Sequence, residues 1–276
     1  MGKPRKKEVS SIALIFLIAF LIQTGYGMPM ETLIYGGVEA TPGDFPWMVS
    51  LQIPRGDSSG HDHACGGTLV SPNKVVTAAH CVEELRNYPL GSTQVVAGAH
   101  NLSASENWKQ IRVIQPSKIY VHYLYSKEAS SYDVAVIEFT SQFVETDYVS
   151  WASLAHSNAS GTCEIAGWGA TEHTTRMSDV LRKATLPIVP KDDCSRIYDV
   201  FDGESQICAG RPEGGIDMCL GDTGGAIICS NPGYKFFAGV ASSGFFCGVS
   251  GYPGIYTEVS AVIPWLLNPT IIPSSK

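Results

Sequence analysis

The sequence predicts an all-β protein, built as a sandwich or a barrel. Short apolar segments rich in β-branched residues recur along the chain, and clusters of glycine, proline and polar residues separate them. The helical signals are few and short. Apolar residues make up 44% of the chain and charged residues 16%, which is typical of a globular protein.

The strand-like segments begin after Phe45. The clearest of them are residues 47–51, 68–70, 74–77, 95–97 and 133–139. Short helices are expected over residues 190–197 and 260–267. The polar stretch 156–161 is the candidate linker between two halves of the fold.

The first 27 residues have the pattern of a secretory signal peptide. Four basic residues open the chain, an apolar run of 11 residues covers 12–22, and Gly25 and Gly27 offer small residues for cleavage. The run is shorter than the ~20 residues of a membrane span. We expect residues 1–27 to be a signal peptide, residues 28–33 to be a short propeptide-like segment, and the protein to be secreted.

Charge and cysteine content narrow the class further. The formal net charge is −7, and removing residues 1–27, with four basic residues and one acidic residue, would leave −10. An acidic surface argues against nucleic acid or an anionic membrane as the partner. Eight cysteines in an exported chain indicate four disulfides.

Three motifs follow one another along the chain. They are Thr-Ala-Ala-His-Cys at 77–81, Asp-Val-Ala-Val-Ile at 133–137 and Gly-Asp-Thr-Gly-Gly-Ala at 221–226. Together they resemble the chymotrypsin/trypsin-like serine proteases (peptidase S1), over about residues 34–267. The resemblance implies two six-stranded antiparallel β-barrels, over about 34–154 and 155–267, with a short C-terminal helix.

The resemblance assigns His80 as general base and Asp133 as the carboxylate that orients it. An imidazole suits the first role because its pKa lies near neutrality. Asp133 would accept a hydrogen bond from the ring and fix its tautomer. Ser242 matches a serine that helps to hold this aspartate.

Thr223 stands where the family has its nucleophilic serine, and Ala226 replaces a proline. Threonine has a hydroxyl, but its extra methyl restricts χ1 in a loop shaped for serine. We therefore expect a degenerate nucleophile. The backbone amides of Gly221 and Thr223 would form the oxyanion hole.

The stretch Ile34-Tyr35-Gly36-Gly37 is similar to the mature N-terminus of the family. There, cleavage before the isoleucine frees an ammonium that pairs with the aspartate before the nucleophile, here Asp222. Leu33 offers no basic residue to a trypsin-like activator, and Tyr35 is bulkier than the usual valine. Ile34 is therefore either a new N-terminus or an ordinary apolar strand residue.

The substrate pocket retains part of the family pattern. Asp217 matches the floor aspartate that pairs with arginine or lysine, and Gly244 and Gly254 match glycines that keep the pocket open. Met218 directly follows Asp217, at a position where trypsins have a small polar residue. Its long apolar side chain is expected to narrow the pocket and to desolvate Asp217.

The wall of the substrate pocket differs more strongly from the family pattern. Ser243 occupies the position of a tryptophan that usually forms an apolar wall for the substrate. Phe245 and Phe246 follow at once. They are either ordinary loop packing or an exposed surface for a partner.

The resemblance also supplies disulfide pairs that counting alone cannot. They are Cys65 with Cys81, Cys163 with Cys229, Cys194 with Cys208, and Cys219 with Cys247. Two sequons, at Asn101 and Asn158, are candidate glycosylation sites.

No metal or other cofactor is expected. Ala99 lies where calcium-binding trypsins have an acidic ligand, and it cannot coordinate an ion. His61, Asp62 and His63 form a short cluster, which we interpret as a solvated loop.

Two hypotheses remain. The first is a secreted, catalytically impaired protease homologue and a monomer, which binds extracellular proteins such as a protease, an inhibitor or a substrate-like partner. The second is an active endopeptidase with a threonine nucleophile that cleaves after arginine or lysine. Departures at Thr223, Met218 and Ser243 favour the first.

Overall fold

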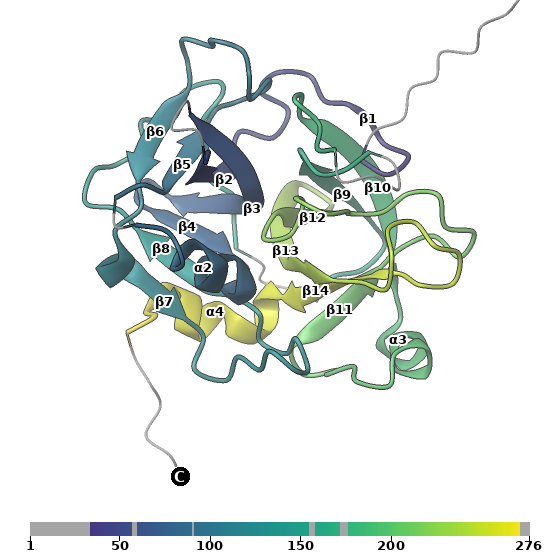
Figure 1. Cartoon of the computed structure of the whole chain (residues 1–276). Helices are drawn as coiled ribbons and strands as arrows, with labels where there is room; N and C mark the ends of the chain where they lie inside the picture. Colours follow the sequence, from purple (N-terminus) through teal and green to yellow (C-terminus); the bar gives the residue numbers. More distant parts are fainter. Residues whose placement is uncertain (1–33, 57–59, 90, 155–157, 172–175, 271–276) are drawn as a thin grey trace, which may run out of the picture. The chain divides into compact units, whose positions relative to one another are not determined.

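The structure is a computed structural model that describes residues 34–56, 60–89, 91–154, 158–171 and 176–270. Its strands form two antiparallel sheets, as Figure 1 shows. The expected signal peptide and propeptide-like segment lie outside the described residues. In the part that is described, no helix is long and apolar enough to cross a membrane.

Seven strands, in the spatial order β6-β5-β2-β3-β4-β8-β7, form the sheet of the N-terminal half. Their bounds are β2 (Met48–Pro54), β3 (His61–Ser71), β4 (Lys74–Thr77), β5 (Gln94–Ala97), β6 (Gln110–Val113), β7 (Ile119–Val121) and β8 (Ala135–Glu138). Among the described residues, no pairing joins β6 to β7, so this sheet curves as an open barrel. A 3-10 turn, η1 (Pro116–Lys118), separates these two short edge strands.

The second sheet closes on itself. It contains β1 (Val38–Glu39), β9 (Thr162–Gly167), β10 (Arg182–Val189), β11 (Gln206–Ala209), β12 (Ala226–Asn231), β13 (Tyr234–Ser243) and β14 (Gly254–Glu258). The long strand β10 pairs with β9 along residues 182–187 and with β11 at 188–189. That double pairing joins the two ends of a six-stranded ring, and β1 adds to its outside.

These sheets confirm the predicted all-β class and the two-barrel architecture. One detail differs, because β1 lies in the N-terminal half of the sequence but pairs with β10 of the second sheet. The start of the described chain therefore packs with the C-terminal barrel. There Ile34 is 1% exposed.

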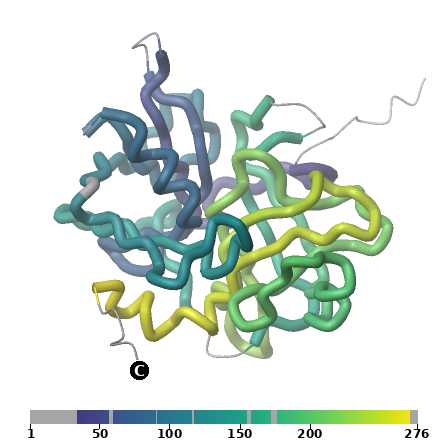
Figure 2. Tube along the Cα trace, turned by 60° about the horizontal axis from the view of Figure 1, so that its bottom comes forward, coloured from purple at the N-terminus to yellow at the C-terminus, as the bar shows by residue number. Residues whose placement is uncertain are grey.

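Helices are short. The predicted helices over 190–197 and 260–267 are confirmed as α3 (Lys191–Ile197) and α4 (Val259–Leu267). A third, α2 (Ala79–Leu85), was not predicted, because its seven residues directly follow the strand-like run that ends in β4. In Figure 2 the yellow α4 ends the described chain.

One hydrophobic core runs through both sheets. Hydrogen bonds connect them: the Gly66 amide in β3 donates to the Thr223 carbonyl at 2.8 Å, and the Phe237 amide in β13 donates to the Ser153 carbonyl at 2.8 Å. Residues far apart in the sequence therefore meet where the two barrels touch.

Candidate active site

His80 is the second residue of α2, which starts where β4 ends. Its Nδ1 lies 2.7 Å from Asp133 Oδ2, and its backbone amide donates to Asp133 Oδ1 at 3.0 Å. Asp133 lies just before β8, the strand that pairs with β4. Neighbouring strands thus bring together two residues that are 53 positions apart in the sequence.

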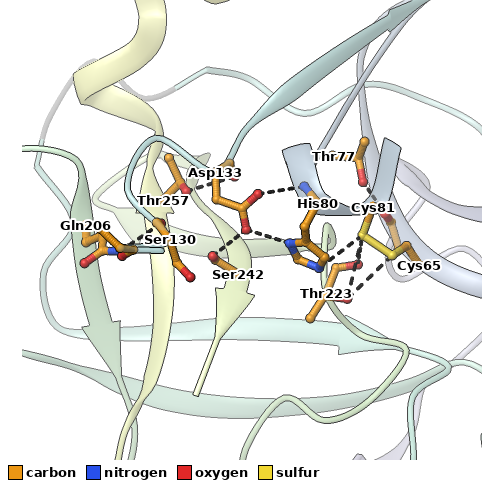
Figure 3. A network of polar contacts seen from close by, with 12 residues as sticks. Cys65, Thr77, His80, Cys81, Ser130, Asp133, Gln206, Thr223, Ser242 and Thr257 are labelled. Carbon is orange, nitrogen blue, oxygen red and sulfur yellow. Dashed lines mark hydrogen bonds and ion pairs between the residues drawn. A yellow bond between two sulfur atoms is a disulfide. The ribbon is translucent and has the colours of Figure 1, made fainter. Parts of the chain in front are cut away.

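Two hydroxyls complete the surroundings of Asp133, which is 2% exposed. Ser242 donates to Asp133 Oδ2 at 2.6 Å, and Thr257 donates to the Asp133 carbonyl at 2.9 Å. Figure 3 shows both bonds beside the His80 ring. The predicted contact between Ser242 and this aspartate is therefore present.

Burial and charge act against each other at this pair. Burial of the ring lowers the pKa of His80, but the hydrogen bond and the charge of Asp133 outweigh it, so the pKa is raised. For Asp133, burial acts to raise the pKa, and the His80 and Ser242 hydrogen bonds lower it overall. Each residue thus favours the charged form of the other.

Thr223 lies beside His80, but its hydroxyl does not engage the ring. The Oγ1 atom is 3.6 Å from Cys65 Sγ and 3.7 Å from Cys81 Sγ. Among the described residues it makes no hydrogen bond to His80, and Figure 3 shows its contacts directed at the disulfide. A disulfide sulfur carries no proton and is a weak acceptor. The hydroxyl is therefore packed against sulfur.

The loop around Thr223 keeps a tight backbone. Gly224 has a φ of 85°, and a Cβ there would lie 2.2 Å from Thr77 Oγ1 and 2.4 Å from the Gly66 carbonyl oxygen. In the described part of the chain, the amides of Gly221 and Thr223 donate to no protein acceptor. An oxyanion hole formed by these two amides stays a prediction.

His63 supports this loop, a role that no motif in the sequence indicates. Burial lowers the pKa of His63 to about 4, so the ring is neutral. Its Nε2–H donates to the Gly221 carbonyl at 2.8 Å, while the Ser50 hydroxyl lies 2.8 Å from Nδ1 and donates to it. No sequence signal joins residues 158 positions apart.

The solvated-loop interpretation of residues 61–63 was wrong, because all three belong to β3. His61 Nε2 lies 2.9 Å from the Ser92 carbonyl oxygen, and Asp62 pairs with Arg55 at 2.6 Å. The alternation of a strand places Asp62 on the face opposite to His61 and His63. These three side chains therefore do not converge on one point.

Asp222 is buried with its carboxylate held by amides. Gly169 donates to Oδ1 at 2.7 Å and Cys219 donates to Oδ2 at 2.9 Å, while burial raises the pKa of Asp222 to about 7. Ile34 and Asp222 both line a small cavity of about 10 Å³. The structure therefore brings Ile34 and Asp222 together, as the resemblance implied. An ion pair between them stays a prediction.

Tyr35, the residue after Ile34, contacts two residues of the candidate substrate pocket, Asp217 and Gly248. A Cβ on Gly248 would lie 2.1 Å from Tyr35 Cδ1, so the ring covers the backbone of this glycine. The Asp217 amide donates to the Tyr35 carbonyl at 3.1 Å, and the Gly248 amide donates to Asp217 Oδ2 at 3.2 Å. The bulkier residue is accommodated because position 248 is glycine.

Asp217 itself is enclosed, with 3% of its surface exposed. A Cβ on Gly254 would lie 2.8 Å from Asp217 Oδ1 and 3.2 Å from Met218 Cε, so the methionine methyl lies against the pocket. Burial raises the pKa of Asp217 to about 7. The buried hydroxyl of Tyr256 has no hydrogen-bond partner among the described residues.

The pocket wall includes Gly244, which faces Gly254 across the opening: a Cβ on Gly244 would lie 3.8 Å from Gly254 Cα. Ser243 ends β13 and pairs with Ile255 of β14. Phe245 and Phe246 come next and are 55% and 65% exposed. They are therefore surface residues and do not refill the wall.

All four predicted disulfides are present. They are Cys65–Cys81, Cys163–Cys229, Cys194–Cys208 and Cys219–Cys247. The first anchors α2 to β3, and the last joins the nucleophile loop to the loop after β13. Both therefore fix backbone beside the candidate site.

Cys65, His80 and Cys81 come close enough together to suggest a metal site. The two sulfurs are joined in a disulfide, which leaves no thiolate to ligate an ion. The loop at residues 98–109 contains a second cluster of oxygens, but Lys109 Nζ occupies its centre. That ammonium donates to the carbonyl oxygens of Asn101, Leu102 and Ala104.

Known proteins match this chain in sequence over most of its length. The trypsin family model matches residues 34–266. Trypsin-1 of Astacus astacus is 36% identical over 84% of this chain and 98% of its own length, and the clotting factor G beta subunit of Tachypleus tridentatus is 34% identical over 86% and 80%. Ovochymase-2 of Mus musculus is 35% identical, and the match spans 40% of its length. The chain therefore belongs to the trypsin family of serine proteases.

Proposed function

We propose that this protein is a secreted trypsin-like protease homologue with impaired catalysis, which acts by binding proteins in an extracellular proteolytic system. The observation that carries the proposal is the Thr223 hydroxyl, which lies against the Cys65–Cys81 disulfide and makes no hydrogen bond to His80 among the described residues.

A working nucleophile must hand its proton to His80 Nε2. The Nδ1–H of His80 donates to Asp133, so Nε2 is the acceptor. Thr223 carries both a methyl and a hydroxyl on Cβ, and turning the hydroxyl toward Nε2 moves the methyl into another packed position. A misplacement of about 1 Å costs about 10²-fold in rate.

The pocket supports the same conclusion. Asp217 is almost fully enclosed, and its Oδ1 and Met218 Cε both lie close to Gly254. Its raised pKa of about 7 leaves it partly neutral near neutral pH, which weakens it as an anchor for a basic side chain. The methionine methyl beside Gly254 would narrow the path of a basic side chain to this carboxylate.

An active endopeptidase with Thr223 as nucleophile and specificity for arginine or lysine is the alternative. The ordered His80–Asp133–Ser242 contacts and the free amides of Gly221 and Thr223 favour it. The two hypotheses differ in whether the threonine hydroxyl can reach His80 during turnover and in whether a basic side chain can reach Asp217.

A rescue assay separates them. Protein beginning at Ile34 would be tested with an arginyl ester and a fluorophosphonate probe, as wild type and as Thr223→Ser, with His80→Ala in both backgrounds. We expect wild type at background and Thr223→Ser with turnover that depends on His80. Wild-type labelling that disappears in His80→Ala would overturn the proposal.

If Thr223→Ser also stays at background, Thr223→Ser with Met218→Ser tests the closed pocket. Turnover in this double variant would show that Met218 is a second block. Wild type at background together with an inactive double variant still supports impaired catalysis.

The remaining parts of the proposal follow the sequence. The signal peptide would direct secretion, and Asn101 and Asn158 would carry glycans. Asn158 is exposed, and Asn101 is half-buried with its Oδ1 accepting the Ser103 amide at 3.0 Å. The protein would be a monomer whose partner is a protease, an inhibitor or a substrate-like protein, and no cofactor takes part.

A further inference from the structure

Four aromatic rings contact one another in a row beside the candidate pocket. Tyr198 meets Tyr252 edge to face with centroids 6.2 Å apart, Tyr252 stacks on Phe245 at 4.6 Å, and Phe245 meets Phe246 edge to face at 4.9 Å. We call these four residues the aromatic strip. It joins the residue that follows α3 to the loop between β13 and β14.

The aromatic strip is exposed and held in place. Phe245, Phe246 and Tyr252 are 55%, 65% and 38% exposed. Tyr198 fixes one end, because its hydroxyl donates to the Pro253 carbonyl at 2.6 Å. Phe245, Phe246 and Tyr252 are thus open to solvent. Because neighbouring rings already hold these side chains, they lose little conformational freedom when a partner binds.

Acidic side chains outnumber basic ones around the strip, and Arg196, two residues before Tyr198, is paired with Asp193 at 2.6 Å. The segment 198–220 holds one basic residue, Arg211, and five acidic residues, which are Asp199, Asp202, Glu204, Glu213 and Asp217. Arg211 donates to the Thr185 carbonyl at 3.3 Å. Residues 243–257 carry no charged side chain. The loops that present the rings are therefore acidic or neutral.

Hydrogen bonds place this acidic segment beside the strip. The Gly251 amide donates to the Pro212 carbonyl at 3.1 Å, and the Ser250 hydroxyl donates to it at 2.9 Å. Glu213 is the next residue, and Asp199 directly follows Tyr198. The negative charge of Asp217 also contributes to raising the pKa of Tyr198, after burial.

A ring face attracts a cation, and surrounding carboxylates strengthen that attraction. Arginine suits such a surface best, because its planar guanidinium stacks on aromatic rings and is weakly hydrated. We propose that the aromatic strip is a docking surface for an arginine-bearing segment of a partner protein. This inference rests on the proposed protein-binding function and identifies the chemistry of the partner.

The probe is a fluorescein-labelled peptide Gly-Gly-Arg-Arg-Gly-Gly, compared with the same peptide carrying citrulline, which has the shape of arginine without its charge. Fluorescence anisotropy would measure both with protein beginning at Ile34. We expect the arginine peptide to bind more tightly, and Phe245→Leu with Phe246→Leu and Tyr252→Leu to weaken it about tenfold. Leucine keeps apolar bulk and leaves the net charge unchanged.

Two controls make the result decisive. Tyr234→Leu removes a 45% exposed ring in the β12–β13 hairpin and should leave binding unchanged. Asp217→Asn tests whether the guanidinium enters the pocket. Equal binding of both peptides, or loss on Asp217→Asn with no effect of the leucine changes, would overturn the inference. Neither result depends on turnover, so the inference can fail while the proposed impairment of catalysis stands.

Discussion

Replacing Lys109 with alanine should destabilise the protein and create a weak calcium site. Lys109 Nζ donates to the carbonyl oxygens of Asn101 at 2.7 Å, Leu102 at 3.3 Å and Ala104 at 2.6 Å, and it lies 3.6 Å from Glu106 Oε2. The side chains of Lys109 and Glu106 are 12% and 10% exposed. The lysine thus serves as the cation of an oxygen-lined loop.

The expected loss of stability follows from the groups that lose their partner in Lys109→Ala, which are the Glu106 carboxylate and three carbonyl oxygens. Removing one partner of a buried ion pair costs about 3–5 kcal/mol. Water can reach part of this loop, because Ala104 is exposed, so we expect the lower end, about 3 kcal/mol. At about 2–4 °C per kcal/mol for a domain of this size, Tm should fall by about 6–12 °C.

Calcium should restore part of that loss. Three carbonyl oxygens and one carboxylate are the hard ligands that calcium prefers. A site with a Kd of about 1 mM, in 10 mM calcium, would regain about 1.4 kcal/mol. Thermal unfolding of Lys109→Ala with and without calcium chloride, against sodium chloride of equal ionic strength, measures this.

Lys127→Ala is the matched control, because Lys127 is exposed and has no ion pair among the described residues. It should change stability by no more than about 0.5 kcal/mol. An unchanged Tm in Lys109→Ala, or a wild-type protein that gains as much from calcium as the variant, would refute the reasoning.

Two further predictions concern the candidate site. Because Asp133 raises the pKa of His80, Asp133→Asn should lower it in an NMR titration of the imidazole protons; an unmoved pKa would contradict the assigned pairing. In wild type, the His80 contribution to stability is present below the unfolded pKa of about 6.5 and is lost as pH rises through the folded pKa. Gly224→Ala should cost more than about 2 kcal/mol by chemical denaturation, since its Cβ would overlap Thr77 and Gly66 at a positive φ. Gly233 has a φ of 98° with open space around it, so Gly233→Ala should cost only about 1–2 kcal/mol. If both variants lose the same stability, the positive φ alone accounts for the loss and the predicted overlap at Gly224 is wrong.

Much of the fold could be predicted because its signals are local. Segments of β-branched residues became β2, β4, β5 and β8, and the three motifs placed His80, Asp133 and Thr223 in the correct chain order. The disulfide pairs followed from the family resemblance, and the structure contains all four. The short α2 was missed because seven helical residues directly after a strand leave little periodicity to detect.

Long-range contacts were not predictable from the chain. The exchange of β1 into the second sheet depends on its pairing with β10, in which Val38 meets Lys183, 145 residues later in the sequence. In the loop around Lys109, the sequence shows only that position 99 is alanine and lacks an acidic ligand. Nothing local indicates that a lysine ten residues further on would fill the oxygen-lined centre.

The sequence by itself determined the family resemblance and the doubtful nucleophile, because both reside in residue types and their order. Only the tertiary structure decided where the Thr223 hydroxyl points, that Met218 lies against the pocket beside Asp217, and that four separate aromatic residues form one strip. The physical reason is that side-chain torsions and burial are set by neighbours in space. Here those neighbours come from both barrels, and their positions exist only once the two sheets have packed together.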